Sequence, residues 1–149
     1  MIAKLSNDQI DLVLKTEVVG RIGCHADGKV YIVPIVYVFD GNHIYAHSKE
    51  GQKLRMMRQN PDVCFEVDHI DGMAAWQSVI VWGRFEEVKN ETILQQKGIK
   101  LLSDRLTPLT LNHEPKQLDD VPSYYLEKNM NAILFRIKVI EKTGRFETH

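Results

Sequence analysis

The sequence has no excess charge of either sign and few cysteines. Its 149 residues carry 19 lysines and arginines against 20 aspartates and glutamates, a formal net charge of −1. This balance excludes a global basic surface for nucleic acid, so any anion site has to be local. Both cysteines, Cys24 and Cys64, lie in apolar runs typical of strands. That placement favours small buried side chains over a disulfide or a catalytic thiol.

Long apolar segments are also absent. The N-terminal MIAKLSNDQIDLVLK contains acidic residues and lacks the apolar core of a signal peptide. No stretch approaches the roughly 18 apolar residues that are needed to span a bilayer. We therefore expect a cytoplasmic protein with no membrane segment. With 44% hydrophobic residues, the chain has the size and composition of a single domain over residues 1–149.

Motifs for nucleotide loops, serine hydrolysis and zinc are missing. Neither GxxxxGK[ST] nor GxGxxG occurs, and there is no GxSxG elbow. Among the six histidines, only His43 and His47 are four residues apart. Both lie in a predicted strand, where they would point to one face but stand too far apart for one metal ion. These absences argue against a resident metal and against a nucleophilic hydrolase.

Alternation of apolar and polar residues predicts a mainly antiparallel β structure. The turns Asp27-Gly28 and Asp40-Gly41 separate three strand-like runs and predict a three-stranded meander. Three further runs are VCFEVD, WQSVIVWGRFEEV and, from Ala132 to Glu141, AILFRIKVIE. Six strands, with a long segment before the last one, predict a closed or partly closed barrel with helices on its outside and ends.

Helices are expected between and beside the strands. Ser6 and Gln9 form a capping-box pattern for a short helix that ends near Lys15. Leucines and isoleucines at helical spacing in residues 90–106 predict one kinked helix or two short ones. Prolines then mark an irregular segment, and residues 123–129 are expected to form a helical turn.

One turn gathers basic and polar side chains beside a helix start. A strand ends at His47-Ser48, Gly51 allows close approach of the backbone, and a helix begins near Gln52 or Lys53. Free backbone N–H groups, a hydroxyl and an ammonium group at one point suit a phosphate. The alternative is a capped surface helix whose charged side chains lie in solvent.

Two other features are compatible with a ligand. Pro34 interrupts a strand, and because proline cannot donate to a ladder, it marks a bulge or a backbone that faces something other than a neighbouring strand. Trp76, Gln77 and Ser78 place an aromatic plane, an amide and a hydroxyl together, which suits hydrogen bonds to a heterocycle. The alternative is that Trp76 packs over the barrel end while the polar pair faces solvent.

These pieces occur in an order that resembles a known superfamily. The matching runs are GRIGCHADGKVYIVPIVYVFDGNHIYAHS, GQKLRMMRQNPDVCFEVD, WQSVIVWGRFEEV and the terminal KTGR. They resemble the FMN-binding split-barrel superfamily of the pyridoxamine 5'-phosphate oxidase type, in particular its short branch with the nitroimidazole-resistance reductases. The resemblance covers most of the chain. It implies a six-stranded antiparallel split β-barrel that forms a homodimer with FMN at the interface.

The resemblance also implies which residues hold each part of FMN. The phosphate would lie against the turn before the helix, and the ring edge against the backbone of the proline-containing strand. The implied residues are His47, Ser48 and Lys53 for the phosphate, with Arg58 as a further candidate; Val33, Pro34, Ile35 and Val36 for the ring edge; and Gln77 and Ser78, from the same or the partner subunit, for additional contacts. Arg21, on the first strand, is a further candidate contact to the cofactor.

Protein side chains do not easily carry hydride or single electrons, so a bound flavin would supply that chemistry. The expected activity is an FMN-dependent oxidoreductase that takes electrons from NAD(P)H or another donor and passes them to a small acceptor. His25, His69 and Trp76 are expected to line the exposed flavin face, but no residue is marked as catalytic.

Alternatives remain open at this point. Haem or a deazaflavin would replace FMN in some split barrels, with His25 or His113 as an axial haem ligand, or the chain would be a non-catalytic binding module. True pyridoxamine-phosphate oxidases end in a segment with an Arg and a His that hold the substrate phosphate. Here only Arg145 and His149 follow the last strand, so we do not expect vitamin B6 oxidation.

Overall fold

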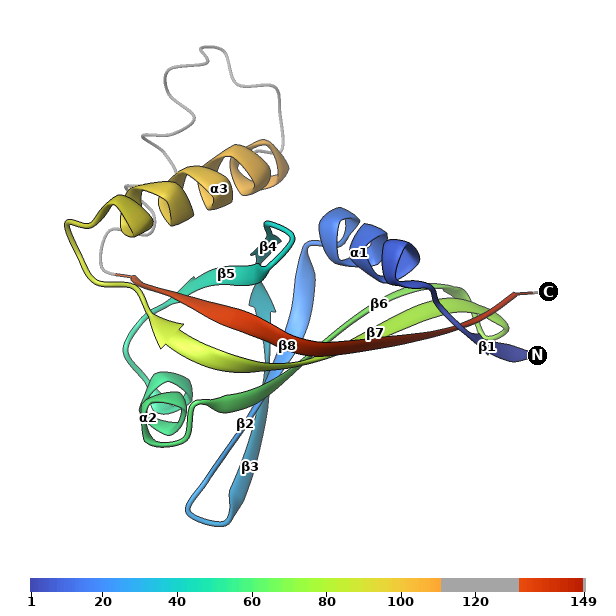
Figure 1. The fold of residues 1–149 in the computed structure, drawn as a ribbon, viewed down its shortest axis with the longest axis horizontal. Helices are drawn as coiled ribbons and strands as arrows, with labels where there is room; N and C mark the ends of the chain where they lie inside the picture. Colours follow the sequence, from blue (N-terminus) through green and yellow to red (C-terminus); the bar gives the residue numbers. More distant parts are fainter. Residues whose placement is uncertain (111–131, 149) are drawn as a thin grey trace.

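The computed structural model describes residues 1–110 and 132–148. Within them the chain forms eight strands and three helices (Figure 1). In chain order these are β1 (Ile2–Lys4), α1 (Asn7–Thr16), β2 (Val19–Ala26), β3 (Lys29–Val36), β4 (Val38–Phe39), β5 (His43–Ser48), α2 (Gln52–Gln59), β6 (Asp62–Gly72), β7 (Ala75–Glu87), α3 (Ile93–Thr110) and β8 (Ile133–Glu147). None of these helices is long and apolar enough to cross a membrane.

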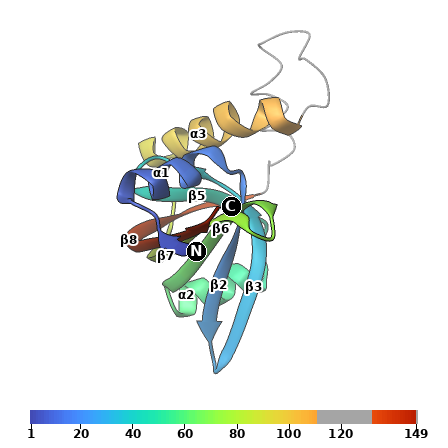
Figure 2. The ribbon, with the colours of Figure 1, turned by 90° about the vertical axis from the view of Figure 1, so that its right-hand side faces the viewer.

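All the described strands belong to one antiparallel sheet. Their order is β3-β2-β6-β7-β8-β5-β4, and β1 pairs with β8 outside this path. The sheet curls strongly, and the β2–β3 hairpin extends beyond the other strands at the bottom of Figures 1 and 2. The terminal strands β3 and β4 do not pair with each other, so the sheet is not closed. The predicted class, a mainly β antiparallel split barrel with flanking helices, is confirmed.

The predicted three-stranded meander is wrong in its middle. Both hairpins form, β2 with β3 and β4 with β5. The run between them, however, divides at Tyr37, and its two halves lie at opposite ends of the sheet. Tyr37 is completely buried, and its hydroxyl donates a hydrogen bond of 2.8 Å to the Leu14 carbonyl of α1. This anchor turns the chain from one edge of the sheet to the other.

The strand count therefore rises from the six expected to eight. One extra strand comes from the division at Tyr37, and the other is β1, which is too short to show a period. β8 is also longer than expected, because it continues past Glu141 to pair with β7 as far as Trp76 and with β1. A shift in register between Trp82 and Gly83 accommodates the bend in this long pair.

Helix α1 agrees closely with the sequence-based prediction, and α3 agrees with it less well. The capping box at Ser6 is present, with Gln9 N–H donating to the Ser6 hydroxyl at 3.2 Å and Ser6 N–H to the Gln9 side chain at 2.8 Å. α3 is one continuous helix that includes Gly98 and Pro108. A Cβ at Gly98 would lie 2.7 Å from Leu134, so the glycine lets the helix approach the sheet. The predicted turn at 123–129 lies outside the described residues.

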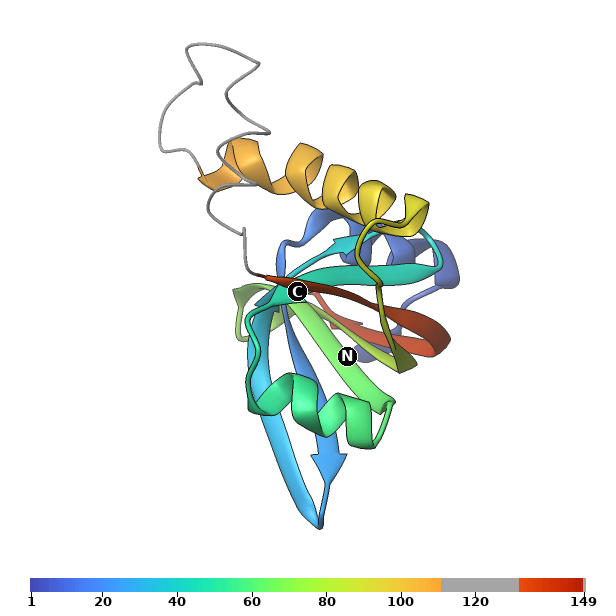
Figure 3. The ribbon, with the colours of Figure 1, turned by 90° about the vertical axis from the view of Figure 1, so that its left-hand side faces the viewer.

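Two apolar cores hold the helices on the sheet. The larger lies between the inner face of the sheet and helices α1 and α2, and its fully buried members include Leu14, Ile22, Leu54 and Phe65. The smaller lies under α3 and includes Tyr45, Val88, Leu102, Leu106 and Leu134. Figure 3 shows α2 and α3 at opposite ends of the curled sheet. The turn before α2 is therefore positioned by the larger core.

Candidate functional site

The turn between β5 and α2 leaves the start of the helix open. β5 ends at Ser48, and α2 begins at Gln52 with Gly51 as its N-cap. No side chain caps this helix, and the Ser48 hydroxyl donates instead to the Lys49 carbonyl at 2.9 Å. The first N–H groups of a helix lack partners within the helix and carry its positive end. The turn therefore offers donors to an anion.

Lys53 adds a cation to this helix start. Its side chain is half-buried, and no carboxylate among the described residues forms an ion pair with it. Burial lowers the pKa of Lys53, and the nearby Cys24 thiol acts in the opposite direction. An ammonium group removed from water without an acidic partner is costly unless an anion balances it. Lys53 thus suits a phosphate better than it suits solvent.

His47 and Cys24 lie within electrostatic reach of the same cation. Burial lowers the pKa of His47, a backbone hydrogen bond opposes this effect, and Lys53 lowers the pKa further, which favours the neutral imidazole. Cys24 is buried on the inner side of β2, with its thiol 3.6 Å from the Tyr31 carbonyl. Three of the elements, β2, β5 and α2, therefore meet at Lys53. Of the predicted phosphate residues, His47, Ser48 and Lys53 are brought to one place.

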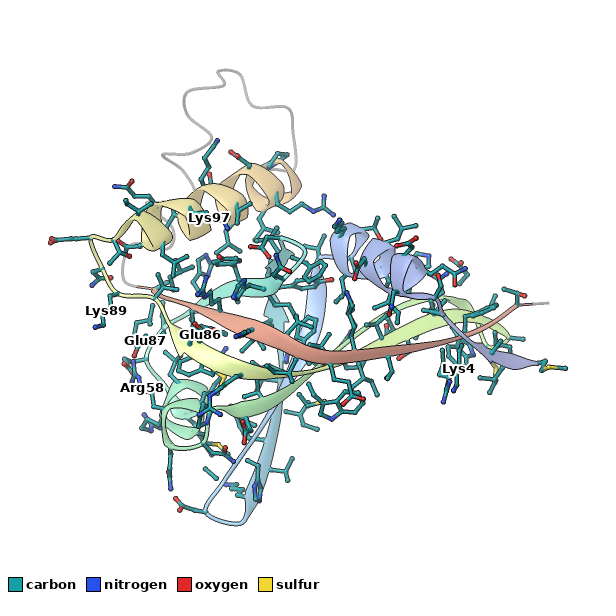
Figure 4. The ribbon with its side chains drawn as sticks, in the orientation of Figure 1. Lys4, Arg58, Glu86, Glu87, Lys89 and Lys97 are labelled. Carbon is teal, nitrogen blue, oxygen red and sulfur yellow. The ribbon has the colours of Figure 1, made fainter. Side chains whose placement is uncertain are left out.

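Arg58, the further candidate on the same helix, is committed elsewhere. Its guanidinium bonds to Glu87 at 2.5 and 3.2 Å and to Glu50 at 2.6 Å. The bonds to these two carboxylates raise the pKa of Arg58. Figure 4 shows Arg58 beside Glu87, at the end of β7. The structure therefore commits Arg58 to two carboxylates, Glu87 at the end of β7 and Glu50 in the turn before α2.

The predicted ring-edge residues lie on an edge strand. Val33, Pro34, Ile35 and Val36 belong to β3, which pairs with β2 in an unbroken register and has no strand on its other side among the described residues. No bulge occurs at Pro34. The alternative interpretation remains, in which the backbone of this strand faces something other than a neighbouring strand. Proline is tolerated on an edge strand because no neighbouring strand there needs a hydrogen bond from the N–H group that proline lacks. The open edge leaves backbone groups for a ligand.

The phosphate turn and the edge strand are neighbours in the fold. α2 packs against β2, and β2 is the strand to which β3 is paired. Cys24, which faces Lys53 from β2, stands opposite Tyr31 of β3. A ligand whose anion sits at Lys53 would therefore extend along the neighbouring edge of the sheet.

Gln77 and Ser78 do not join this turn within one chain. Ser78 pairs with Asp68 on β6, whereas α2 ends just before Asp62. At about 3.3 Å per residue, the six residues between Asp62 and Asp68 place Ser78 about 20 Å along the sheet from the C-terminal end of α2. Trp76 lies at the same far end, where its indole N–H donates to Glu147 at 3.1 Å. Within the chain, Ser78 is linked across the sheet to Glu66, which lies near Arg21, the residue that pairs with Pro34 of β3.

A cavity of about 570 Å³ opens on the outer face of the sheet, the side of β2, β3, β6 and β7 turned away from the core. Its lining is mostly apolar and includes Val30, Ile32 and Trp82, with Arg21 and Glu66 at a polar corner. All three apolar side chains are exposed, Val30 and Ile32 by 66%. Such exposure of large apolar groups in one place is typical of an interaction surface.

The polar corner was missed by the sequence analysis. Arg21 lies 3.9 Å from the Glu66 carboxylate and 3.8 Å from that of Asp68, and the Ser78 hydroxyl donates to Glu66 at 3.1 Å. Burial, followed by the hydrogen bond and charge of Asp68, raises the pKa of Glu66 to about 7. Arg21 and Ser78 were candidate cofactor contacts, but the sequence did not predict that they lie beside Glu66 and Asp68.

The histidines have separate environments. His25 lines the outer-face cavity, whereas His69 is exposed and bonds to Glu17 at 2.6 Å and to Asp71 at 3.1 Å. His113 lies outside the described residues. Within residues 1–110 and 132–148, no group of three or more His, Cys, Asp or Glu side chains could hold a metal ion. His25 thus faces a mostly apolar cavity, whereas His43 lines a more polar one beside β8.

Comparison with known proteins agrees with this architecture. An uncharacterized protein of Rhizobium meliloti, RA0666, is 36% identical over 141 residues, which are 95% of this chain and 92% of that protein. The crystal structure of a FAD-binding protein from Mesorhizobium loti superposes with a TM-score of 0.76 at 30% identity and covers 99% of both chains. HutZ, the haem storage protein of Vibrio cholerae, has a TM-score of 0.68 at 13% identity over 95% of this chain and 93% of its own. At that identity the likeness shows the fold alone.

The family assignment rests on the sequence as well as on the fold. A family model described as pyridoxamine 5'-phosphate oxidase matches residues 6–134. The matched range includes the open turn before α2, the edge strand β3 and the polar corner of the outer face. The chain therefore belongs to the pyridoxamine 5'-phosphate oxidase family.

Proposed function

We propose that the protein is an FMN-dependent oxidoreductase that acts as a homodimer. The observation that carries this proposal is Lys53, a half-buried cation with no acidic partner among the described residues, at the uncapped start of α2. Together with the open edge of β3 nearby, it matches a ligand that has a phosphate at one end and a polar ring at the other.

The residues of this chain would each hold one part of the cofactor. Lys53, the Ser48 hydroxyl and the first N–H groups of α2 bind the phosphate, and His47 lies beside them as a neutral imidazole. Backbone groups of Val33–Val36 bind the polar edge of the ring. The bound flavin would supply the electron transfer, while the protein sets its position and access.

A second copy completes the site in this proposal. Gln77 and Ser78 lie on β7, away from the turn before α2, and in this proposal they contact the ring of the partner's cofactor. The exposed apolar side chains of the outer face, among them Val30, Ile32 and Trp82, are the surface that such a copy would cover. A monomer at micromolar concentration in light scattering would contradict this arrangement.

The expected electron donor is NAD(P)H, and the expected acceptor is a small molecule that stacks on the exposed face of the flavin, such as a nitroimidazole. Arg145 lies within β8 and not after the last strand. Arg145 pairs with Ser78 and Lys4 in the register of the sheet, and His149 lies outside the described residues.

Absorption spectra test the cofactor. Purified protein should show flavin bands, or gain the altered bands of a bound flavin when FMN is added. FAD is titrated in parallel, and we expect FMN to bind more tightly. Protein that is colourless and shows no change with either flavin would refute the proposal. NAD(P)H consumption with and without a nitroimidazole then separates an enzyme from a non-catalytic flavin carrier, which would bind FMN without turnover.

Haem is the second candidate, and His25 is the observation that favours it. Its imidazole lines an apolar cavity, which is the environment that an axial haem ligand needs. Titration with haem should then produce a sharp Soret band that is lost in His25→Ala. A haem complex of equal strength in both proteins would exclude His25 as the ligand.

A further inference from the structure

The Ser78 hydroxyl is held by a carboxyl group that can change its charge near neutral pH. Ser78 Oγ lies 3.1 Å from Glu66 Oε2, and the residues stand on neighbouring strands, β7 and β6, on the same outer face. Glu66 in turn bonds to Asp68 on its own strand and lies 3.9 Å from Arg21 on β2. Ser78 therefore belongs to a polar cluster whose members come from three adjacent strands, β7, β6 and β2.

The charge of Glu66 decides what Ser78 offers to a ligand. A hydroxyl has one hydrogen to donate and two lone pairs that accept. When Glu66 is ionised, the carboxylate takes the hydrogen in a charge-assisted bond and leaves only lone pairs. When Glu66 is protonated, it bonds to Asp68 and is a weaker acceptor, so the Ser78 hydrogen is free to turn outward.

We propose that Glu66 is a positioning residue that sets, through Ser78, whether the flavin ring of the partner meets a hydrogen-bond donor or an acceptor. This inference rests on the proposed function, which brings Ser78 to that ring. The polar edge of a flavin carries both carbonyl oxygens, which need donors, and an N–H group, which needs an acceptor. A change at Ser78 would therefore alter both the affinity for the flavin and its electronic state.

The groups around Glu66 support a change in the charge of its carboxyl group near neutral pH. Asp68 and burial disfavour its charged form, whereas Arg21 and Ser78 favour it, and the resulting pKa is about 7. Arg145 of β8 stands opposite Ser78, and its charge acts in the same sense as that of Arg21. On the β3 side, the position opposite Arg21 is Pro34, which carries no charge.

Titration of the protein without ligand tests the first half of the proposal. Carbon-detected NMR of the carboxyl groups should show Glu66 titrating near pH 7 in the wild type and at least one unit lower in Asp68→Asn. Asp62→Asn is the matched control, because Asp62 lies on the same strand and lines the same cavity but pairs with Arg84 instead. It should leave the Glu66 titration unchanged. A Glu66 midpoint near its ordinary value would overturn the proposal.

Flavin binding tests the second half. FMN affinity and the FMN absorption maximum are measured from pH 6 to 8 in the wild type, Glu66→Gln, Ser78→Ala and Asp62→Asn. The phosphate of FMN titrates in the same range, but it does so in all four proteins. We expect an additional three- to tenfold change in affinity, with a shift of the maximum, in the wild type and Asp62→Asn only. Circular dichroism confirms that each variant is folded.

The outcomes separate the two proposals. If FMN binds and its pH response is the same in Glu66→Gln or Ser78→Ala as in the wild type, the proposed function stands and the role of Glu66 is refuted. If no flavin binds at any pH, both are refuted, whatever the carboxyl titration shows. Loss of the extra response in both variants, with the response kept in Asp62→Asn, supports the assignment.

Discussion

Arg58 and Glu87 form a two-point ion pair in which Nη2 lies 2.5 Å from Oε1 and Nε lies 3.2 Å from Oε2. The pair joins α2 to the end of β7 and uses the planar guanidinium in the geometry that best fits a carboxylate. It also divides the basic residues of this helix into two groups. Arg58 serves the packing of α2 on the sheet, while Lys53 stays available at the helix start.

The first prediction concerns Lys53. Lys53→Ala should weaken FMN binding by about 10- to 100-fold, because it removes a charge-assisted bond to the phosphate. Ser48→Ala in the same chain should weaken it further. Fluorescence titration of FMN measures both effects. Arg55→Ala is the matched control, since Arg55 is exposed on the same helix, and it should bind FMN as the wild type does.

Arg58→Ala extends this control to the ion pair. The affinity for FMN should fall by less than in Lys53→Ala, since the Arg58 guanidinium is already bonded to Glu87 and to Glu50 and is not available to the phosphate. Unchanged FMN binding in Lys53→Ala would refute the assignment of Lys53 to the phosphate. A loss of affinity in Arg58→Ala as large as that expected for Lys53→Ala would refute the assignment of Arg58 to the ion pair alone.

The second prediction concerns Gly83, which lies at the register shift between β7 and β8. A Cβ there would lie 2.5 Å from Ile137 Cγ2 and 2.6 Å from the Lys138 carbonyl oxygen. Gly83→Ala should therefore lower the free energy of unfolding by about 1 to 3 kcal/mol, as measured by urea denaturation. Gly23→Ala meets its nearest atom only at 3.7 Å and should change stability little. Equal effects at the two positions would contradict this reasoning.

The third prediction concerns the hydroxyl of Tyr37. Tyr37→Phe leaves the buried Leu14 carbonyl at the end of α1 without its partner, so the free energy of unfolding should fall by about 1 to 3 kcal/mol. Tyr31→Phe provides the comparison, because its hydroxyl makes no hydrogen bond within the described residues. Chemical denaturation should find Tyr31→Phe close to the wild type. A Tyr37→Phe protein as stable as the control would show that water replaces the bond.

The fourth prediction concerns pH and stability. The pKa of Glu66 is about 7 in the folded chain, above its ordinary value of about 4.3. The folded protein therefore holds a proton that the unfolded chain has released. The resulting stabilisation is fully present below about pH 4 and is lost as the pH rises through 7. It amounts to about 1 to 3 kcal/mol.

Urea denaturation at pH 5 and pH 8 measures this contribution. Other groups titrate in the same interval, so the quantity to compare is the difference between the wild type and Glu66→Gln. The loss of stability between the two pH values should be smaller in Glu66→Gln, and in Asp62→Asn it should equal that of the wild type. Parallel pH profiles for the wild type and Glu66→Gln would contradict the raised pKa.

Local features of the fold could be predicted from the sequence. The capping box at Ser6 and the hairpins at Asp27-Gly28 and Asp40-Gly41 depend on residues close together in the chain. The division at Tyr37 could not be predicted, because it depends on a hydrogen bond to Leu14 of α1 and on the curl of the whole sheet. Alternation shows which face a side chain takes, but not which strand lies beside it.

The candidate site, like the fold, could be predicted only where its residues are close together in the sequence. The polar turn at His47, Ser48 and Lys53 is contiguous, so its composition was informative. Whether a basic residue of α2 is free or paired depends on Glu87, which is 29 residues from Arg58. Glu66 and Arg21 meet only because β2 pairs with β6. Pairings between distant strands carry no local signal, and for that reason the polar corner was missed.

The place of β8 in the sheet has a consequence for how the protein is made. β8 pairs with β1, β5 and β7, and it leaves the ribosome after every other described strand. Until then, β5 and β7 each lack a neighbour, and the barrel cannot be assembled on the nascent chain. Unpaired strand edges favour association with other chains. Yield in the cell should therefore depend on how quickly the last strand is delivered, and a stalled or truncated chain would be a substrate for chaperones rather than a partly working protein.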